Sequence, residues 1–477
     1  MTDYGLPAGR TLAVRIGGLD LPEALLQARK EGKLVVFAGA GVSMPPPSNY
    51  PNFTDLAYLT EGWARIFLQR VFETFTVLFV GYSHDDPPMN YIARGFTPEM
   101  GKGRRFALIP AGEEERWTYR GVVPVAYRLA VEPMAHSAVS TGLAAWAEQA
   151  RFGMLEKEQR IRTIVSLPPP IDREDGDFVL DAFSEVSTTR FFANYADSVL
   201  WMKWVEEKKL LRRLFDPTAT ITEVDAELAW WLLEKFLCQY AGETLSLVRR
   251  QGQRLNPYFW NRIGHKLSQK WTTEENRDAL RRWVAVLTIL HPTGTDCEPL
   301  EYIAAKFSFP EDIEVALIVF EYLTRPMLRL KHDLWGEINE NPPRENIRFE
   351  LKSNGGGFWL DHLWLRFFQP NLDKLSHRLE PVIMSQLELA YVLSNSDKGI
   401  AGAWDTLSLS RSLIEERDNG RQNGGLGVLI DAAYDVITWN ATNRPEKCDA
   451  LIELWFSGYS FLLKRLAIFA VSLCKHT

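Results

Sequence analysis

Cysteine is scarce in this sequence. The four residues lie far apart among 477 positions, with no CxxC pair and no histidine at zinc-ligand spacing; they are Cys238, Cys297, Cys448 and Cys474. A disulfide framework is typical of small secreted domains and is not expected for a chain of this length. We therefore expect reduced thiols and no metal site.

The chain also lacks an excess of positive charge and a long uninterrupted apolar run. Its net charge is −7, so no basic field favours nucleic acid as the main ligand. The N-terminus has no basic segment followed by an apolar one, as a signal peptide would. The most apolar stretch, residues 461–473, is too short to span a bilayer and is interrupted by Lys464 and Arg465. A buried or half-buried helix is expected there, in a cytoplasmic protein without membrane partners.

What is present is an ordinary globular composition whose pattern changes along the chain. With 46% hydrophobic and 24% charged residues, a chain of this length suggests two or three domains. Short continuous apolar runs predict buried parallel strands at residues 34–37 and 76–80, and residues 105–109 and 122–127 are predicted as further strands. Residues 21–30 and 60–74 have apolar side chains at helical spacing, and Pro22 suits the first position of the earlier helix. An α/β Rossmann-like domain is therefore expected over residues 1–130.

The remainder of the chain has a helical pattern. Beyond residue 133 strand-like runs become rare, so residues 131–477 are expected to be mostly α-helical, and stacked helices of a solenoid are one arrangement that fits. Most of the 16 tryptophans lie here and suit either a helix-packing core or a recognition surface. The glycine-rich residues 424–427 follow no strand, which favours a helix connection over a phosphate loop. The chain ends directly after an apolar helix, which fits a truncated C-terminus.

Two of the predicted strands open into loops that contain glycine and serine. Glycines allow a tight turn and bring backbone N–H groups against an anion, and a serine adds a hydroxyl donor. The residues that could face a bound dinucleotide are Gly39, Ala40, Gly41 and Ser43 after the first strand, and Gly81, Ser83 and Asp85 after the second. Loops at the carboxyl ends of neighbouring parallel strands can meet at one crevice. The alternatives are a simple tight turn for the first loop and helix capping for Asp85 and Asp86.

These motifs resemble a known family. The run FAGAGVS, a proline-rich loop and then VLFVGYSHDDP are similar to the sirtuin-like domain of bacterial multidomain proteins linked to antiphage defence, in which a long helical region often follows. The resemblance covers about residues 12–130. It implies a Rossmann-like sheet, NAD as ligand or substrate, and cleavage of NAD+ to nicotinamide and ADP-ribose. It also assigns the first loop to the phosphates and Gly81 and Ser83 to the ribose and phosphates.

The chain departs from the family pattern where the chemistry lies. Asn52 stands in place of the aspartate of the family's Pro-Asp-Phe-Arg run, and no arginine follows Phe53. The family's catalytic Asn-x-Asp and histidine lie between the two loops, but here only residues 54–75 separate Phe53 from the second strand, and neither element is found. His84 is the only histidine in the first 130 residues. We infer an internal deletion near residues 53–57, and no catalytic residue can be assigned.

Two functions of different class follow from these observations. The first is a sirtuin-like NAD-binding protein of the antiphage type, whose NAD+ hydrolase activity is weakened or lost, with a protein trigger or a homo-oligomer acting through the helical region. The second is a non-catalytic nucleotide-binding protein or a helical scaffold or sensor. The two glycine loops favour the first function, and the missing catalytic residues favour the second.

Overall fold

The chain forms two compact units in the computed structural model, Met1–Trp204 and Val205–Thr477. The structure describes residues 13–39, 66, 70–83, 103–119, 121–130, 136–170, 172–273, 276–331, 348–396, 406–409, 411, 413–415 and 424–474. Among these residues, no helix combines the length and the apolar character needed to cross a membrane.

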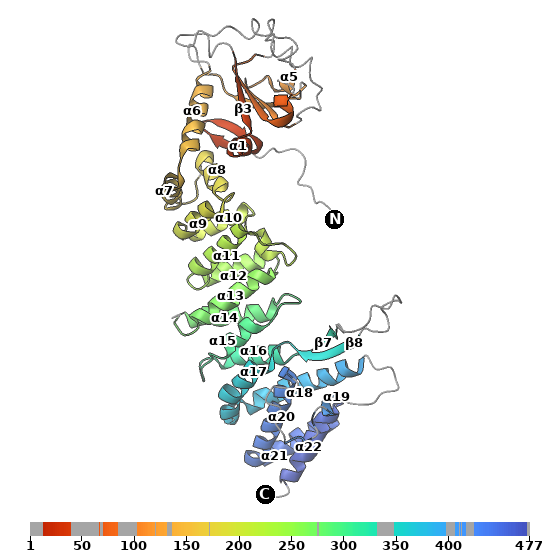
Figure 1. The fold of residues 1–477 in the computed structure, drawn as a ribbon. Coiled ribbons are helices and arrows are strands. Elements are labelled where there is room, and N and C mark those ends of the chain that lie inside the picture. Colours follow the sequence, from red (N-terminus) through yellow and green to blue (C-terminus); the bar gives the residue numbers. More distant parts are fainter. Residues whose placement is uncertain are drawn as a thin grey trace, which may run out of the picture. The chain divides into compact units, whose positions relative to one another are not determined.

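The first unit is built on a parallel sheet of four described strands (Figure 1). They are β3 (Leu34–Ala38), β4 (Thr76–Val80), β5 (Arg105–Pro110) and β6 (Val123–Tyr127), and each pairs in parallel with the next. The four predicted strands are thus confirmed to within one residue at each end. Because all four strands are parallel, their carboxyl ends share one edge of the sheet.

Both faces of this sheet are buried, as expected for a parallel sheet. On one face, Val77 and Phe79 of β4 pack with Phe72, Trp117 and their neighbours. On the other face, the alternate β4 residues Leu78 and Val80 join a separate cluster. The strand β4 is therefore buried along its whole length, whereas β3 is only partly buried and Val36 is 52% exposed. Among the described strands, β3 pairs with β4 alone.

A hairpin that was not predicted precedes the sheet. The strands β1 (Ala13–Ile16) and β2 (Leu19–Pro22) are antiparallel and are joined by Gly17 and Gly18, both at positive φ, a conformation that glycine adopts without strain. The predicted helix follows as α1 (Glu23–Lys30). The expectation for Pro22 was wrong by one position, because Pro22 ends β2 and is the N-cap of α1 rather than its first residue.

Most other described elements of the first unit are helices. They are α5 (Glu114–Thr118), α6 (Ser137–Arg151), α7 (Met154–Val165), α8 (Arg173–Ala182), α9 (Val186–Tyr195) and α10 (Val199–Glu207), the last of which crosses into the second unit. Of the helix predicted over residues 60–74, the structure describes residues 66 and 70–74, which are helical. The helix α8 lies along β1, where the Asp177 carboxylate accepts a hydrogen bond of 2.7 Å from the backbone N–H of Arg15.

The second unit is mostly helical, as predicted. Its elements before the C-terminal part are η2 (Arg212–Phe215), α11 (Glu223–Lys235), α12 (Ala241–Arg250), α13 (Pro257–Lys270), α14 (Arg277–Ile289), α15 (Glu298–Ala304) and α16 (Ile313–Thr324). Helices two apart in the sequence, such as α11 and α13 or α14 and α16, contact one another. Large side chains fill the interior, and the fully buried tryptophans of this unit are Trp231, Trp260, Trp271, Trp283, Trp364 and Trp455. These tryptophans form core, whereas Trp230 is 39% exposed.

The C-terminal part of the second unit contains a hairpin that the sequence did not reveal. The strands β7 (Pro326–Lys331) and β8 (Arg348–Ser353) are antiparallel. The remaining helical elements are α17 (Gly357–Leu363), η3 (Trp364–Phe368), η4 (Gln369–Asn371), α18 (Leu372–Ser396), α19 (Thr406–Leu409), α20 (Gly424–Asn443), α21 (Pro445–Ser457) and α22 (Phe461–Cys474). The apolar stretch at residues 461–473 is confirmed as a helix with one buried side.

The prediction that residues 424–427 form a helix connection was wrong. They are the first turn of α20, and Gly425 to Gly427 are buried. A Cβ added at Gly425 would lie 2.3 Å from the Ser353 hydroxyl oxygen and 3.0 Å from the Gly355 carbonyl oxygen. Glycine is therefore required here for close packing of the helix against the end of β8, a reason that periodicity cannot reveal.

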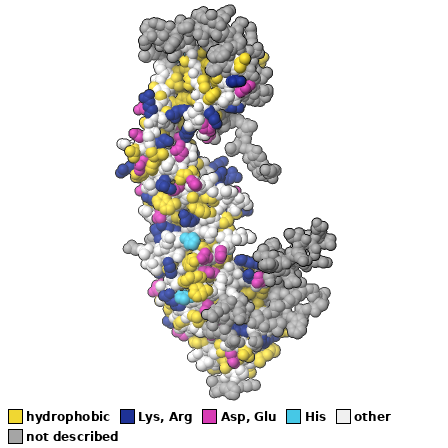
Figure 2. All heavy atoms as spheres, viewed as in Figure 1, with side chains coloured by type: hydrophobic (Ala, Val, Ile, Leu, Met, Phe, Trp, Pro, Cys, Tyr) yellow, Lys and Arg dark blue, Asp and Glu magenta, His cyan; other side chains and the backbone are white. Residues whose placement is uncertain are grey.

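The visible surface of the described helices has mixed charge. Figure 2 shows Lys and Arg side chains interspersed with Asp and Glu, with hydrophobic side chains exposed between them. On this face, the described residues form no continuous field of one sign. Charged side chains distributed in this way are typical of ordinary solvated surfaces.

Candidate functional site

The two predicted loops begin side by side at the carboxyl edge of the sheet. The backbone N–H of Gly39, which follows β3, donates a hydrogen bond of 2.8 Å to the carbonyl oxygen of Val80, the last residue of β4. A Cβ added at Gly39 would lie 2.2 Å from the carbonyl oxygen of Gly81. Only a residue without a side chain fits between these backbones, so the starts of both loops are in direct contact.

The second loop turns sharply as it leaves the sheet. Gly81 has φ +74°, which favours glycine. Tyr82 folds back toward the first loop, because its hydroxyl donates a hydrogen bond of 3.2 Å to the carbonyl oxygen of Ala38. Its ring stands edge-on to Phe79, with centroids 6.0 Å apart. Tyr82 thus ties the second loop to the strand that carries the first, and the exposed Ser83 follows it.

The predicted site residues divide into two groups. Gly39, Gly81 and Ser83 belong to the described part of the chain, and the structure brings the first two into contact. The others lie outside the described residues; they are Ala40, Gly41, Ser43 and Asp85, together with His84. The described part of the site is therefore mainly backbone at the ends of β3 and β4, together with the side chains of Tyr82 and Ser83.

The same edge of the sheet carries polar groups that sequence reasoning missed. At the end of β6, the Tyr127 hydroxyl and Nδ1 of His136 are 2.7 Å apart. Burial raises the pKa of Tyr127, and the nearby charge of Glu113 raises it further. After β5, the Gly112 N–H donates to the Glu114 carboxylate at 2.8 Å. The only sequence signal was position, since Tyr127 ends β6 and Gly112 lies just beyond β5, whereas His136 is nine residues further along the chain.

A second set of chemically capable side chains lies in the helical unit and has a structural role. The Cys297 sulfur is 3.8 Å from Nε2 of His291, which resembles a nucleophile beside a base. However, burial raises the pKa of Cys297 to about 12, so the thiol stays protonated at neutral pH and cannot act as a thiolate nucleophile. Burial likewise lowers the pKa of His291, whose ring packs 4.6 Å from that of Trp260. This arrangement belongs to the core.

Comparison with known proteins agrees with the geometry of the first unit. Residues 25–124 match the family model described as SIR2-like domain, a segment that extends from α1 into β6 and includes both glycine loops. No curated protein matches the chain, and no solved structure matches it either. The match supports the assignment of a sirtuin-like domain to the N-terminal region of this chain.

Proposed function

We propose that the chain is a sirtuin-like NAD-binding protein of the bacterial antiphage-defence type. The observation that carries this proposal is the contact between Gly39 and Gly81, because it joins the two glycine loops at one edge of a parallel sheet. Open parallel sheets bind their ligands outside the carboxyl ends of their strands. The match of residues 25–124 to the SIR2-like family supports NAD+ as that ligand.

The proposed contacts are mainly made by backbone. Gly39, Ala40 and Gly41 would present N–H groups to the pyrophosphate, and Ser43 would add its hydroxyl. Gly81 and Ser83 would approach the ligand from the neighbouring strand, with Asp85 beyond them. The fit is supported at Gly39, where the absence of a side chain allows the loops to approach each other. Hydrogen bonds from such donors to a charged phosphate are stronger than those between neutral groups.

We further propose that NAD+ cleavage is weak or lost in this chain. Residues 54–75 contain neither the family's Asn-x-Asp nor a histidine, the groups that position and activate the attacking water. The exposure of Val36 on β3 is consistent with strands missing beyond that strand, because an interior parallel strand is normally covered. Loss of a general base and an orienting amide lowers rates by several orders of magnitude.

A binding experiment on the full chain tests the nucleotide site. Calorimetric titration with NAD+ and with ADP-ribose should show one site for each, because both contain the pyrophosphate. Ser43→Ala should weaken both ligands about 10-fold or more through the loss of one charge-assisted hydrogen bond. Ser140→Ala is the matched control, since the Ser140 hydroxyl donates to the Ser137 carbonyl on the exposed side of α6 and bonds no other described residue. Absence of heat with either ligand would reject the proposal.

Turnover separates the two candidate functions. Purified protein incubated with NAD+ should release little or no nicotinamide even when binding is saturated. Binding without turnover supports the alternative of a nucleotide-binding scaffold or sensor, in which the helical unit provides the contacts to a protein trigger or to further copies. Rapid release of nicotinamide would overturn the proposed loss of activity and would direct attention to His84 as a substitute base. The proposed setting is the cytoplasm, where NAD+ is available.

A further inference from the structure

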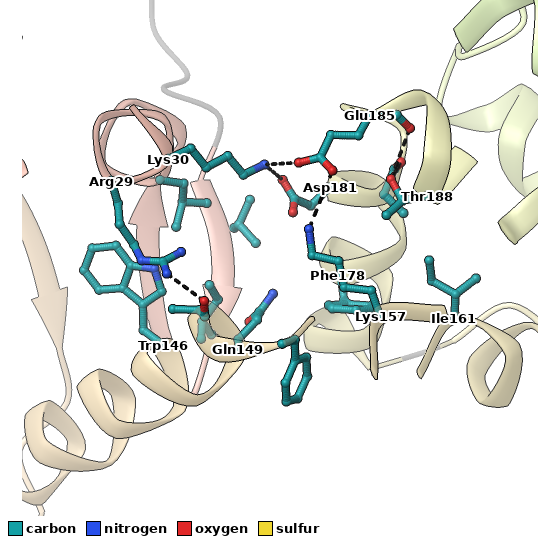
Figure 3. A pocket seen from close by; sticks show the side chains of 16 residues that line it. Arg29, Lys30, Trp146, Gln149, Lys157, Ile161, Phe178, Asp181, Glu185 and Thr188 are labelled. Atoms are coloured by element: carbon teal, nitrogen blue, oxygen red, sulfur yellow. Dashed lines mark hydrogen bonds and ion pairs between the residues drawn. The ribbon is translucent and has the colours of Figure 1, made fainter. Parts of the chain in front are cut away.

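A cleft within the first unit lies apart from the two glycine loops. It is formed where β1 and α1 meet the helices α6 to α9, and it encloses about 140 Å³ (Figure 3). An engineered apolar cavity of about 150 Å³ in another protein holds a benzene molecule, so this volume suits a single ring or a short aliphatic chain. The side of the cleft formed by α1 lies at the amino-terminal end of β3, opposite to Gly39.

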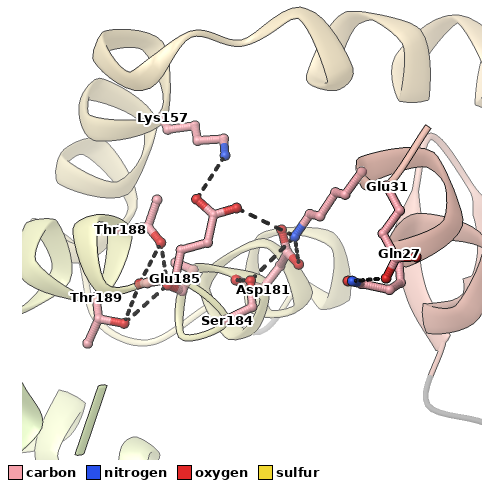
Figure 4. A network of polar contacts seen from close by, with 10 residues as sticks. Gln27, Glu31, Lys157, Asp181, Ser184, Glu185, Thr188 and Thr189 are labelled. Atoms are coloured by element: carbon pink, nitrogen blue, oxygen red, sulfur yellow. Dashed lines mark hydrogen bonds and ion pairs between the residues drawn. The ribbon is translucent and has the colours of Figure 1, made fainter. Parts of the chain in front are cut away.

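The charges in the cleft do not balance. Lys30 lies 3.2 Å from a carboxylate oxygen of Asp181 and 3.9 Å from one of Glu185 (Figure 3). Lys157 lies 3.6 Å from the other oxygen of Glu185 (Figure 4). Two lysines are thus matched by two carboxylates. Arg29 is a third cation lining the same cleft, and it has no carboxylate partner among the described residues.

Arg29 and Gln149 have unused hydrogen-bonding capacity on one side of the cleft. The guanidinium group of Arg29 donates one hydrogen bond, 2.8 Å long, to the Ala150 carbonyl oxygen. Its five N–H groups leave further donors in a planar fork that matches a carboxylate or a phosphate. The side-chain amide of Gln149 has no partner among the described residues and lies beside Arg29 in Figure 3. Together these groups can bind an anionic head.

The remaining walls of the cleft are apolar and well fixed. Trp146 is 7% exposed and lies on the same side as Arg29, whereas Ile161 and Phe178 line the opposite side (Figure 3). Phe178 is held by the Arg160 guanidinium group, which lies 4.1 Å from the centre of its ring. Rigid aromatic walls favour a flat apolar body over a fully polar solute.

We propose that this cleft binds a small amphipathic anion, with a carboxylate or phosphate head held by Arg29 and Gln149 and a ring-sized apolar body between Trp146 and Phe178. The site is separate from the proposed nucleotide site and does not depend on it. A bound molecule would contact both α1, which leads directly into β3, and the helices α6 to α8. The occupant would therefore tie the sheet to the helices that follow it.

Three probes of similar size test the head group. Calorimetric titration of the full chain with benzoate, phenyl phosphate and neutral benzyl alcohol should show binding of at least one anion and binding of the alcohol at least 10-fold weaker. Benzoate and phenyl phosphate distinguish a carboxylate from a phosphate head. If neither anion binds at several millimolar, or if benzyl alcohol binds equally well, the proposal is rejected.

Variants of Arg29 and Gln149 test whether the anion binds in this cleft. Arg29→Gln should weaken the anion at least 10-fold, and Gln149→Leu should weaken it several-fold while leaving Arg29 in place. Arg116→Gln is the matched control, since Arg116 is an exposed arginine of α5 outside the cleft. Thermal unfolding of each variant shows that it is folded before it is titrated. Equal affinity of wild type and both cleft variants would overturn the assignment, and saturating NAD+ should leave the affinity unchanged.

Discussion

Gly39→Ala tests the contact on which the candidate nucleotide site depends. The added Cβ would lie 2.2 Å from the carbonyl oxygen of Gly81 and 2.9 Å from its carbonyl carbon, whereas ordinary contacts begin at 3.4 Å. Both neighbours are backbone atoms and not the ends of flexible side chains. The start of one loop must therefore move by about 1 Å, which in a closely packed interior also strains its surroundings.

The expected decrease in the free energy of unfolding has two contributions. Overpacking of this kind costs about 1–3 kcal/mol. Distortion of the 2.8 Å hydrogen bond from Gly39 N–H to the Val80 carbonyl oxygen adds about 1 kcal/mol. The free energy of unfolding of the first unit should fall by about 2–4 kcal/mol, which lowers its Tm by about 4–16 °C for a domain of 150–250 residues. Affinity for NAD+ should fall as well, because the loops no longer meet in the same geometry.

Differential scanning calorimetry and NAD+ titration of the full chain measure both effects, with two glycine controls. Gly32 has φ +68° and open space around it, so Gly32→Ala carries only the backbone cost of about 1–2 kcal/mol. Gly176 lies inside α8 with its nearest neighbour, Pro170 Cγ, 3.9 Å away, so Gly176→Ala should be neutral or stabilise by about 0.5–1 kcal/mol. If Gly39→Ala unfolds at the temperature of Gly176→Ala and binds NAD+ normally, the loop contact is refuted.

Three further outcomes are expected. A double-mutant cycle with Lys30→Ala and Asp181→Ala should give a coupling energy of about 0.2–1 kcal/mol, because both side chains are about one third exposed. The coupling should diminish in high salt, and a larger, salt-independent value would contradict this. Burial raises the pKa of Glu301 above 4.5, so the folded state holds its proton longer than the unfolded state does, and stability falls as pH rises from the unfolded value through the folded one. The free energy of unfolding of Glu301→Gln, measured with urea across that range, should lack this fall. If the variant and the wild type give parallel pH profiles, Glu301 does not cause the pH dependence. Thiol alkylation of the native chain near neutral pH should modify the partly exposed Cys474 and spare Cys297 and Cys448, since burial raises the pKa of both to about 12. Rapid modification of Cys297 would contradict this and would show that its surroundings open.

The sheet was predictable because its strands are mostly apolar, even though β4 begins with Thr76 and β5 with Arg105. Residues 76–80 were assigned correctly at both ends, since a strand buried on both faces leaves an uninterrupted hydrophobic signal. The β1–β2 hairpin was missed although Gly17 and Gly18 mark its turn, because its strands have only four residues each. The pair β7 and β8 was missed within a long helical pattern, as its alternation extends over only six residues on each strand.

The candidate site was only partly predictable, for a different reason. A strand followed by glycine indicates where a loop begins, so Gly39 and Gly81 could be selected, but their contact depends on β3 and β4 being neighbours in the sheet. Likewise, Tyr127 and His136 are brought together by the end of β6 and the start of α6, which no motif encodes. The cleft at Arg29 draws on six elements distributed from residue 14 to residue 188, and no local pattern could predict it.

Binding and catalysis can be lost separately in such a domain because they depend on different parts of it. The backbone donors of a glycine loop are fixed by strand pairing, and the pairing of β3 with β4 extends from Leu34 to Ala38. Water activation requires particular side chains on further elements, and residues 54–75 do not encode them. A deletion beyond β3 would leave that strand less covered while leaving the contact between Gly39 and Gly81 in place, and Val36 on β3 is 52% exposed. A chain of this kind is therefore expected to retain affinity for the nucleotide longer than it retains turnover.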